Sequence, residues 1–461
     1  MDKFGWFAAG ILGVSFASVP YRSFCQTPEQ FRTVGEFYAR TDGFNGNVVV
    51  FRNSGIISNE SYGLANIELG VPITAKTRFA IGSLTKQFTA ASILLLQEEG
   101  LLKTTDTLAQ HYAATPALWK DVTLRQLLQH TSGIPDGLKN WGTAAFEQDQ
   151  HPPEDIVKSV ASMPLVFSPG SQMEYNNMGY VLLGLVVENV SKQKYADFLQ
   201  QHFFTPLQMQ NTGVGSSTAL IQHRAYGYAP EPNGLHPADP VPFTSSFAAG
   251  GIYSTGEDLA KWLIALHSGR VLNPASYTEM TAPGLEGYGY GLINSTQSGE
   301  SNFYHEGRVS GFASEFEYYP ETKTGIVILS NKLSHNVSPG ANALETDLVH
   351  LSIEHNAAVR SLGGEHHVES VMLSRYTGTY EPISKDDGVP VLVELKDGHL
   401  TFTPSGKGTY TLIARSDDAF YVKEYDWEAE FHKDADGQCL LNAFILPTQT
   451  MLTLRKSPAK K

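Results

Sequence analysis

The segment FAIGSLTKQFTA, Phe79–Ala90, places a serine and a lysine one helical turn apart, at Ser83 and Lys86. A strand-like stretch precedes the pair, and apolar residues recur at helical spacing after it. The Ser83 hydroxyl would then meet the free N–H groups at the start of a helix, with Lys86 on the same face. Burial lowers the pKa of a lysine, so Lys86 could take a proton from Ser83 at neutral pH. A capping serine followed by an exposed lysine is the alternative.

Ser-x-x-Lys occurs twice more in the chain, in different surroundings. Ser191–Lys194 follows a long apolar segment and lies in a polar turn, where both side chains would face water. Ser457–Lys460 lies in a basic tail that contains proline. Only the first pair joins a strand to an apolar helix, so the catalytic prediction rests on Ser83 and Lys86.

A loop before a second apolar helix supplies another polar element. Within FSPGSQMEYNNMGYVLLG it contains Tyr175-Asn176-Asn177, the only Tyr-x-Asn in the chain. A phenol is a poor base at its usual pKa of about 10, and a nearby ammonium such as that of Lys86 would lower this pKa. We expect Tyr175 to shuttle a proton between Ser83 and a leaving group, and Asn177 to hydrogen-bond the substrate or Lys86. Taken alone, this pattern is more typical of a packing tyrosine and a turn asparagine.

Four segments together resemble the superfamily of serine β-lactamases and penicillin-binding proteins. They are SLTK, LLQHTSGIP, FSPGSQMEYNNMGYVLLG and AAGGIYSTGEDLAKWL, and they follow the family's order between about residues 43 and 331. They are most similar to the branch of class C β-lactamases, D-alanyl-D-alanine carboxypeptidases, D-aminopeptidases and related esterases. The resemblance implies that Ser83 is the nucleophile, that Lys86 and Tyr175 are catalytic, and that Asn177 contacts the substrate.

The family carries a third element, Lys-Thr-Gly or His-x-Gly, on the strand that borders the cleft. A literal Lys323-Thr324-Gly325 lies in EFEYYPETKTGIVILSN between two strands, where proline and glycine indicate a hairpin turn. His305-Glu306-Gly307 lies one strand earlier, in YHEGRVSGF, and matches the His-x-Gly variant. His267-Ser268-Gly269 has the same spacing but ends a helix. We therefore assign the third element to His305 and Gly307.

The resemblance also implies an oxyanion hole and a substrate preference. The backbone N–H groups of Ser83 and of Arg308, the residue after Gly307, would stabilise the tetrahedral oxyanion. A histidine of ordinary pKa is mostly neutral at pH 7, so His305 would attract the carboxylate of a penicillin only weakly. We expect weak β-lactam hydrolysis and better turnover of esters, or of amides that lack a carboxylate beside the scissile bond. The Arg308 guanidinium would restore a fixed charge if it turned into the cleft, but it could equally face solvent.

The order of elements predicts an α/β (α+β) fold. Strands are expected on both sides of a turn at Asn53–Gly55 and again at Tyr288–Ile293, Glu315–Pro320 and Gly325–Asn331, with helical patterns between them. This order indicates a β-lactamase/transpeptidase-like fold, an antiparallel sheet flanked by helices with a large helical insertion. Short alternating strands then predict a small all-β barrel, lipocalin-like. The expected boundaries are 1–25 for a signal peptide, 26–358 for the hydrolase domain, 359–370 for a linker, 371–456 for the barrel and 457–461 for a tail.

The first 25 residues have the features of a secretory signal peptide. Lys3 precedes an uncharged, largely apolar stretch that is short for a membrane span, and small residues follow. Cleavage after Ala17 or after Cys25 fits, with the polar start QTPEQ favouring Cys25, and a retained membrane anchor is the alternative. Removal would leave Cys439 alone, without a disulfide framework. We expect a secreted or periplasmic protein of bacterial type, with no stable membrane span after signal removal.

The composition narrows the class of function. The 461 residues exceed one ordinary domain, and 41% hydrophobic with 17% charged residues indicates a folded chain. A net charge of -14 argues against a nucleic-acid partner, which needs a basic face. The histidine spacings do not match common zinc motifs, and the sequence has no Gly-x-Ser-x-Gly elbow. We expect an enzyme without metal or cofactor that acts on a small-molecule or short-peptide substrate, and the oligomeric state stays open.

The predicted reaction is acyl transfer through a covalent intermediate. Ser83 attacks an amide or ester carbonyl while Lys86 and Tyr175 remove its proton, and water then releases the acid. A peptidase or esterase of the penicillin-binding type fits this chemistry best. A β-lactamase is one alternative, and a sensor or scaffold that captures a ligand without turnover is another.

Overall fold

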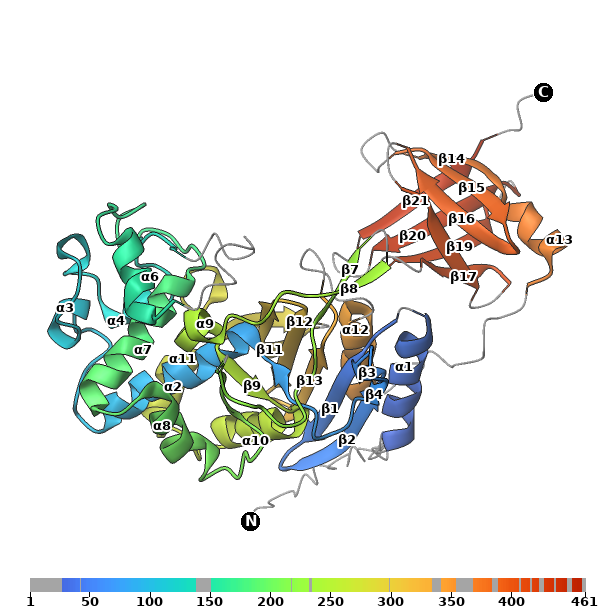
Figure 1. Ribbon diagram of the computed structural model, residues 1–461. Coiled ribbons are helices and arrows are strands. Elements are labelled where there is room, and N and C mark those ends of the chain that lie inside the picture. The colour runs from blue at the N-terminus through green and yellow to red at the C-terminus, as the bar shows by residue number, and fades with distance from the viewer. Residues whose placement is uncertain are drawn as a thin grey trace, which may run out of the picture.

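A six-stranded antiparallel sheet organises the first part of the chain, in the order β10-β11-β12-β13-β1-β2 (Figure 1). The hairpin of β1 (Gly46–Arg52) and β2 (Gly55–Tyr62) comes early in the sequence, and β1 pairs with the late strand β13 along its whole length. The predicted sheet, completed late in the sequence, is therefore confirmed. Its other strands are β10 (Ile293–Gln297), β11 (Glu300–Val309), β12 (Phe312–Tyr319) and β13 (Thr324–Ser330).

The structure is a computed structural model, and the predicted signal peptide falls within residues 1–26, which lie outside the described part of the chain. Most of the predicted linker and tail lie outside it as well, and the domain boundaries stay predictions. The described residues run from 27 to 457, except 42, 138–150, 217, 232–233, 298, 334–340, 354–367, 384–388, 406–407, 415–416, 423–426, 435–436 and 446–449.

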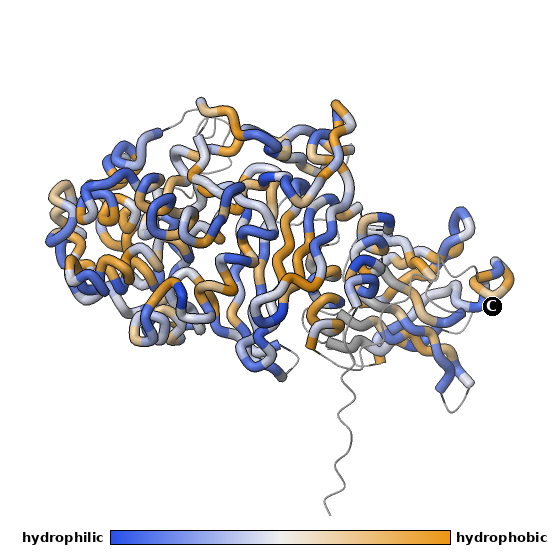
Figure 2. Tube along the Cα trace, turned by 90° about the horizontal axis from the view of Figure 1, so that it is seen from below, coloured by the Kyte–Doolittle hydropathy of each residue, from blue (hydrophilic) through white to orange (hydrophobic). Residues whose placement is uncertain are grey.

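Helices cover both faces of the sheet, which explains the unbroken apolar run of β1. Its GNVVV segment is buried throughout, as expected for a central strand covered on both sides. One face packs against α1 (Pro28–Thr41) and α12 (Ala341–Ile353), and the other packs against α10 (Gly256–His267). Figure 2 shows hydrophobic segments concentrated along the strands in the middle of the molecule.

A helical region inserted between β2 and β10 carries the rest of the core. Its centre is formed by three mutually packed helices, α2 (Thr85–Glu98), α7 (Asn177–Ser191) and α9 (Phe243–Gly250). The first three turns of α7 are buried on all sides, as expected for an apolar helix inside a core. Around them lie α3 (Leu108–His111), α4 (Leu124–Leu128), α6 (Pro153–Val160), α8 (Tyr195–Leu199) and α11 (Pro274–Thr281).

The C-terminal strands close into an eight-stranded antiparallel barrel, as predicted. Strand β21 pairs with both β20 and β14, which completes the ring. Apolar side chains fill its interior, with Tyr380, Leu400 and Leu441 fully buried. The strands are β14 (Gly378–Pro382), β15 (Val391–Lys396), β16 (His399–Pro404), β17 (Tyr410–Ala414), β18 (Ala419–Val422), β19 (Trp427–Lys433), β20 (Cys439–Ile445) and β21 (Thr450–Lys456).

One predicted strand is wrong. The segment Tyr288–Ile293 was expected to be extended, but β10 begins only at Ile293. Gly291 lies just before it with a φ of +70°, a left-handed conformation that interrupts a strand.

Among the described helices, none is long and apolar enough to cross a membrane.

Candidate active site

Ser83 lies in a short 3-10 turn, η1 (Gly82–Leu84), that leads directly into α2. Gly82 has a φ of +48°, and a Cβ placed on it would lie 2.7 Å from the backbone nitrogen of Arg308 on β11. Only glycine combines this backbone conformation with so close an approach. The turn therefore holds the Ser83 hydroxyl between the start of α2 and strand β11. The sequence predicted Ser83 in the first turn of this helix, and the α-helix begins two residues later, at Thr85.

Lys86 is completely buried in the first turn of α2. Its Nζ lies 2.9 Å from Ser83 Oγ, 2.8 Å from Asn177 Oδ1 at the start of α7, and 2.8 Å from the carbonyl oxygen of Ala249 on α9. Three helices thus fix the amine, and its position excludes the alternative of an exposed surface lysine.

These three partners suit a neutral amine whose lone pair faces the serine. The oxygens of Asn177 and Ala249 can only accept hydrogen bonds, whereas the Ser83 hydroxyl can also donate one. When Lys86 is neutral, its two N–H groups keep both acceptors and its lone pair accepts the Ser83 proton. Burial lowers the pKa of Lys86 to about 7, against an opposing attraction from Asp136. The predicted lowering of this pKa is confirmed.

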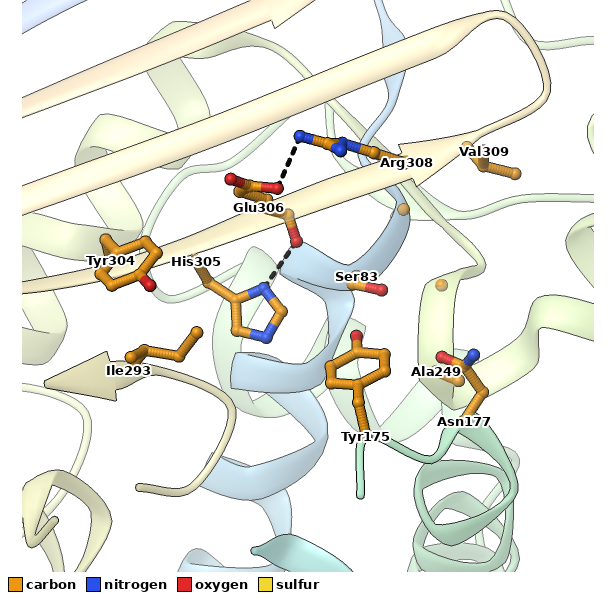
Figure 3. A pocket seen from close by; sticks show the side chains of 12 residues that line it. Ser83, Tyr175, Asn177, Ala249, Ile293, Tyr304, His305, Glu306, Arg308 and Val309 are labelled. Atoms are coloured by element: carbon orange, nitrogen blue, oxygen red, sulfur yellow. Dashed lines mark hydrogen bonds and ion pairs between the residues drawn. The ribbon is translucent and has the colours of Figure 1, made fainter. Parts of the chain in front are cut away.

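Tyr175 lies in the loop before α7, with its hydroxyl directed toward Ser83 (Figure 3). The Lys86 Nζ lies 4.8 Å from the centre of its ring, over the π face. Burial nevertheless raises the pKa of the Tyr175 phenol above its usual value, and a hydrogen bond with Ser83 opposes this only in part. The expectation that Lys86 would lower this pKa is wrong, because loss of solvent around the hydroxyl outweighs the neighbouring amine. Tyr175 is therefore a protonated phenol at neutral pH.

The predicted third element lies on β11, opposite Ser83. His305 is buried, and its Nδ1 lies 2.6 Å from the carbonyl oxygen of Glu306, to which it donates. Its Nε2, 2.9 Å from the Tyr288 hydroxyl, must then be the acceptor. Burial lowers the pKa of His305 to about 3, with a further contribution from Lys86. The predicted neutrality of this side chain at pH 7 is confirmed.

The edge of β11 beside Ser83 is open. Strand β10 pairs only with the first half of β11, up to Tyr304, so no described strand pairs with residues 305–309 on that side. The register pairs Val309 with Phe312 across a two-residue turn, where the closing pair exchanges backbone hydrogen bonds. The next pair, Arg308 with Ala313, is therefore one that does not hydrogen-bond across the two strands. The N–H of Arg308 therefore points away from β12, toward the turn that carries Ser83.

Gly307 allows β11 to approach this turn closely. A Cβ at position 307 would collide with the carbonyl oxygen of Ile81 and with Ser314 Oγ, and would lie 3.0 Å from the backbone nitrogen of Ser83. The close approach places the Ser83 and Arg308 N–H groups at the same end of the cleft. This arrangement is what an oxyanion hole requires.

The Arg308 guanidinium turns away from Ser83 and pairs with a neighbour. Its Nη2 lies 2.6 Å from Glu306 Oε2, and both side chains keep part of their surface exposed (Figure 3). The charges therefore cancel at the mouth of a cavity of about 420 Å³, which Ser83, Tyr175 and Asn177 also line. Among the described residues lining this cavity, Arg308 is the only arginine or lysine.

The other histidine and lysine candidates lie elsewhere. Lys323 lies in the turn between β12 and β13 with a φ of +51°, and Gly325 belongs to β13. Lys323 lines a separate cavity that His267 also borders.

Among the described residues, no group of three or more histidine, cysteine or acidic side chains is arranged to hold a metal ion.

Sequence inspection missed several residues of the site. The carbonyl of Ala249 left no signal, because any residue could supply it. Asp136 and His130 lie in or beside the LLQHTSGIP motif but had no assigned role. Tyr288, the partner of His305, lies in the segment wrongly predicted as a strand.

Comparison with known proteins agrees with this geometry. The family model described as Beta-lactamase matches residues 32–351. Penicillin-binding protein 4* of Bacillus subtilis (strain 168) is 27% identical over 443 residues, which cover 90% of this chain and 94% of that protein. Protein flp of Staphylococcus aureus (strain MW2) is 28% identical over 317 residues, covering 66% of this chain and 62% of that protein.

Solved structures show the same fold. A penicillin-binding protein from Bacillus halodurans is 28% identical with a TM-score of 0.61, covering 70% of this chain and 99% of that one. D-amino acid amidase from Ochrobactrum anthropi SV3 is similar in fold, with a TM-score of 0.64, 24% identity, and coverage of 71% and 98%. Because the family model spans residues 32–351 of 461, the chain belongs to the Beta-lactamase family, within the superfamily of serine β-lactamases and penicillin-binding proteins.

Proposed function

We propose that this protein is an exported serine hydrolase that cleaves amide or ester bonds of a small-molecule or short-peptide substrate through an acyl-enzyme on Ser83. The observation that carries the proposal is the buried Lys86 amine, 2.9 Å from Ser83 Oγ and fixed by two oxygens that can only accept. Export rests on the signal-like sequence of the first 25 residues.

In acylation, Ser83 Oγ attacks the carbonyl carbon while its proton passes to neutral Lys86. The N–H groups of Ser83 and Arg308 stabilise the oxyanion that forms. The proton then passes by way of the Tyr175 phenol to the leaving amine or alcohol, and the scissile bond breaks. In deacylation, water loses a proton to Lys86, attacks the acyl carbon, and releases the acid while Ser83 Oγ regains a proton.

The names of similar proteins support an amide substrate. Penicillin-binding proteins, a D-amino acid amidase and a D-stereospecific amidohydrolase from Streptomyces are among them. The cavity of about 420 Å³ suits a small acyl group or a short peptide. We therefore place the activity among peptidases and esterases of the penicillin-binding type, with carboxypeptidase action as one form of it.

A substrate panel tests this function. Wild type and Ser83→Ala are compared on a penicillin, a D-aminoacyl anilide, a D-Ala-D-Ala peptide and a short-chain p-nitrophenyl ester. The proposal requires turnover of at least one amide or ester by wild type and none above background by Ser83→Ala. Equal rates for both proteins would refute it. Binding without turnover by wild type would favour the sensor or scaffold alternative.

Glu306→Gln is expected to shift preference toward substrates that carry a carboxylate. In wild type the Glu306 carboxylate neutralises Arg308, and His305 is uncharged, so the cleft offers little attraction to the carboxylate of a penicillin. Loss of the carboxylate frees the guanidinium. The ratio of kcat/KM for a penicillin to that for a neutral p-nitrophenyl ester should rise about tenfold, equivalent to about 1.4 kcal/mol.

The matched control is Glu321→Gln, an exposed glutamate in the turn between β12 and β13. It removes the same charge without touching Arg308 and should leave the ratio unchanged. An unchanged ratio in Glu306→Gln would contradict this role of the Glu306–Arg308 pair. A wild type that already prefers the penicillin would favour the β-lactamase alternative.

A further inference from the structure

A buried histidine outside the proposed reaction holds the segment that carries Tyr175. His130 follows α4 and is 1% exposed, with a φ of +58°. This left-handed conformation is uncommon for residues other than glycine, although histidine adopts it more readily than most. Here the conformation turns both the backbone carbonyl and the ring of His130 toward the loop before α7.

His130 hydrogen-bonds the residue on each side of Tyr175. Its carbonyl oxygen accepts from the N–H of Glu174 at 3.0 Å, and its ring Nδ1 accepts from the N–H of Asn176 at 3.1 Å. An Nδ1 that accepts carries no proton, so the ring is neutral with its proton on Nε2. Burial and the neighbouring Lys86 both lower the pKa of His130, which keeps this form across the working pH range.

The same ring packs against the Tyr175 ring. The two ring centres are 4.4 Å apart, and the centre of the Tyr288 ring lies 4.5 Å from that of the imidazole. Tyr175 lies in a loop rather than a helix, so its backbone lacks helical hydrogen bonds, although its ring also lies near Tyr288, His305 and the Lys86 amine. Two backbone hydrogen bonds and one ring contact therefore come from a single residue.

We propose that His130 is a positioning residue that holds the Tyr175 hydroxyl at Ser83 by bracketing its backbone and supporting its ring. The proposal rests on the function proposed above, since it presumes that the phenol transfers a proton. A proton donor must lie within hydrogen-bond reach of the reacting atoms, and a displacement of about 1 Å can cost about 10²-fold in rate.

Two substitutions separate the hydrogen bond to the Tyr175 loop from the ring contact with Tyr175. His130→Phe keeps a ring against Tyr175 but removes the acceptor for Asn176. His130→Asn keeps a short acceptor and tolerates a left-handed backbone, but removes the ring. We expect His130→Phe to lower kcat by about tenfold or more with little change in KM, and His130→Asn to recover part of that loss.

A double-mutant cycle with Tyr175→Phe distinguishes positioning from general structural damage. If His130 acts through the phenol, its substitution should lose almost all effect on kcat/KM once the phenol is gone. The expected loss is about tenfold or more with Tyr175 present and less than about threefold in Tyr175→Phe. The same fold loss in both backgrounds would overturn the proposal.

His267→Phe is the matched control. This histidine is also buried, with a pKa lowered to about 3, and its ring stacks on Tyr318 at 3.8 Å, in a cavity apart from Ser83. Its substitution should lower the melting temperature without changing kcat or the coupling to Tyr175.

Crystal structures of His130→Asn and His130→Phe give a readout that does not depend on activity. We expect the Tyr175 hydroxyl to move or to take more than one position in His130→Phe. An unmoved Tyr175 in both variants would overturn the proposal, even if the protein hydrolysed none of the substrates. Wild-type activity in Tyr175→Phe would instead refute the proposed role of the phenol. The crystal structures would then test only whether His130 fixes the position of Tyr175.

Discussion

Lys86→Met is expected to lower kcat/KM by about 10³-fold, within the range typical of a lost general base. Methionine is similar in length and apolar, so it fits a site that is completely buried. It removes the lone pair that accepts the Ser83 proton and leaves the oxygens of Asn177 and Ala249 without their donor. The measurement is steady-state hydrolysis of a p-nitrophenyl ester by wild type and variant.

The pH profile gives this prediction a second check. Lys86 is an effective base only when neutral, so wild-type kcat/KM should rise with pH through the lysine pKa of about 7 and then level off. His305, with a pKa near 3, does not titrate in this range. The rise near pH 7 should be absent from the residual activity of Lys86→Met. Lys261→Met, which removes a partly exposed lysine paired with Glu257 and Asp258, should keep both rate and profile.

A Lys86→Met protein that retained both a wild-type rate and the rise near pH 7 would exclude Lys86 as the base. Tyr175 would then be the next candidate, but burial raises its pKa above the usual value of a phenol, which predicts a rise far above neutral pH rather than near 7.

Gly307→Ala is expected to lower kcat/KM by about 10²-fold or more and to destabilise the protein. The added methyl group would collide with the backbone oxygen of Ile81, which cannot move aside as a flexible side chain could. Relief of the collision requires β11 to move away from the turn that carries Ser83. That movement pulls the Arg308 N–H from the oxyanion, and loss of one such donor typically costs 10²- to 10³-fold in rate.

Gly55→Ala is the control for this substitution. At position 55, at the start of β2, the nearest atom to an added Cβ is the carbonyl oxygen of Arg52, at 3.9 Å. Activity and melting temperature should stay close to wild type. Wild-type kcat/KM in Gly307→Ala would show that close approach of β11 is not needed for the reaction.

Much of the site could be predicted from short-range sequence patterns. Ser83 with Lys86, and Tyr175 with Asn177, each lie within one or two turns of chain, so local spacing already relates them. His305 could be separated from Lys323 because a strand and a hairpin turn have different residue preferences. Each element is brought to the cleft by the order of strands and helices.

The electrostatics could not be predicted in the same way. The pKa of Tyr175 depends on solvent access to its hydroxyl, which follows from packing that no local pattern records. The pairing of Arg308 with Glu306 depends on two flexible side chains on one face of β11. The hydrogen bonds between His130 and the Tyr175 loop join segments distant in sequence and depend on a left-handed backbone conformation at His130.

Intact-protein mass spectrometry on acid-quenched reactions tests the central claim most directly. With a penicillin or a slowly deacylated ester, wild type should gain the mass of one acyl group, and peptide mapping should place it on Ser83. Ser83→Ala should gain no mass, and Lys86→Met should gain it far more slowly. An adduct on another residue, or an adduct of equal yield in Ser83→Ala, would contradict an acyl-enzyme at Ser83.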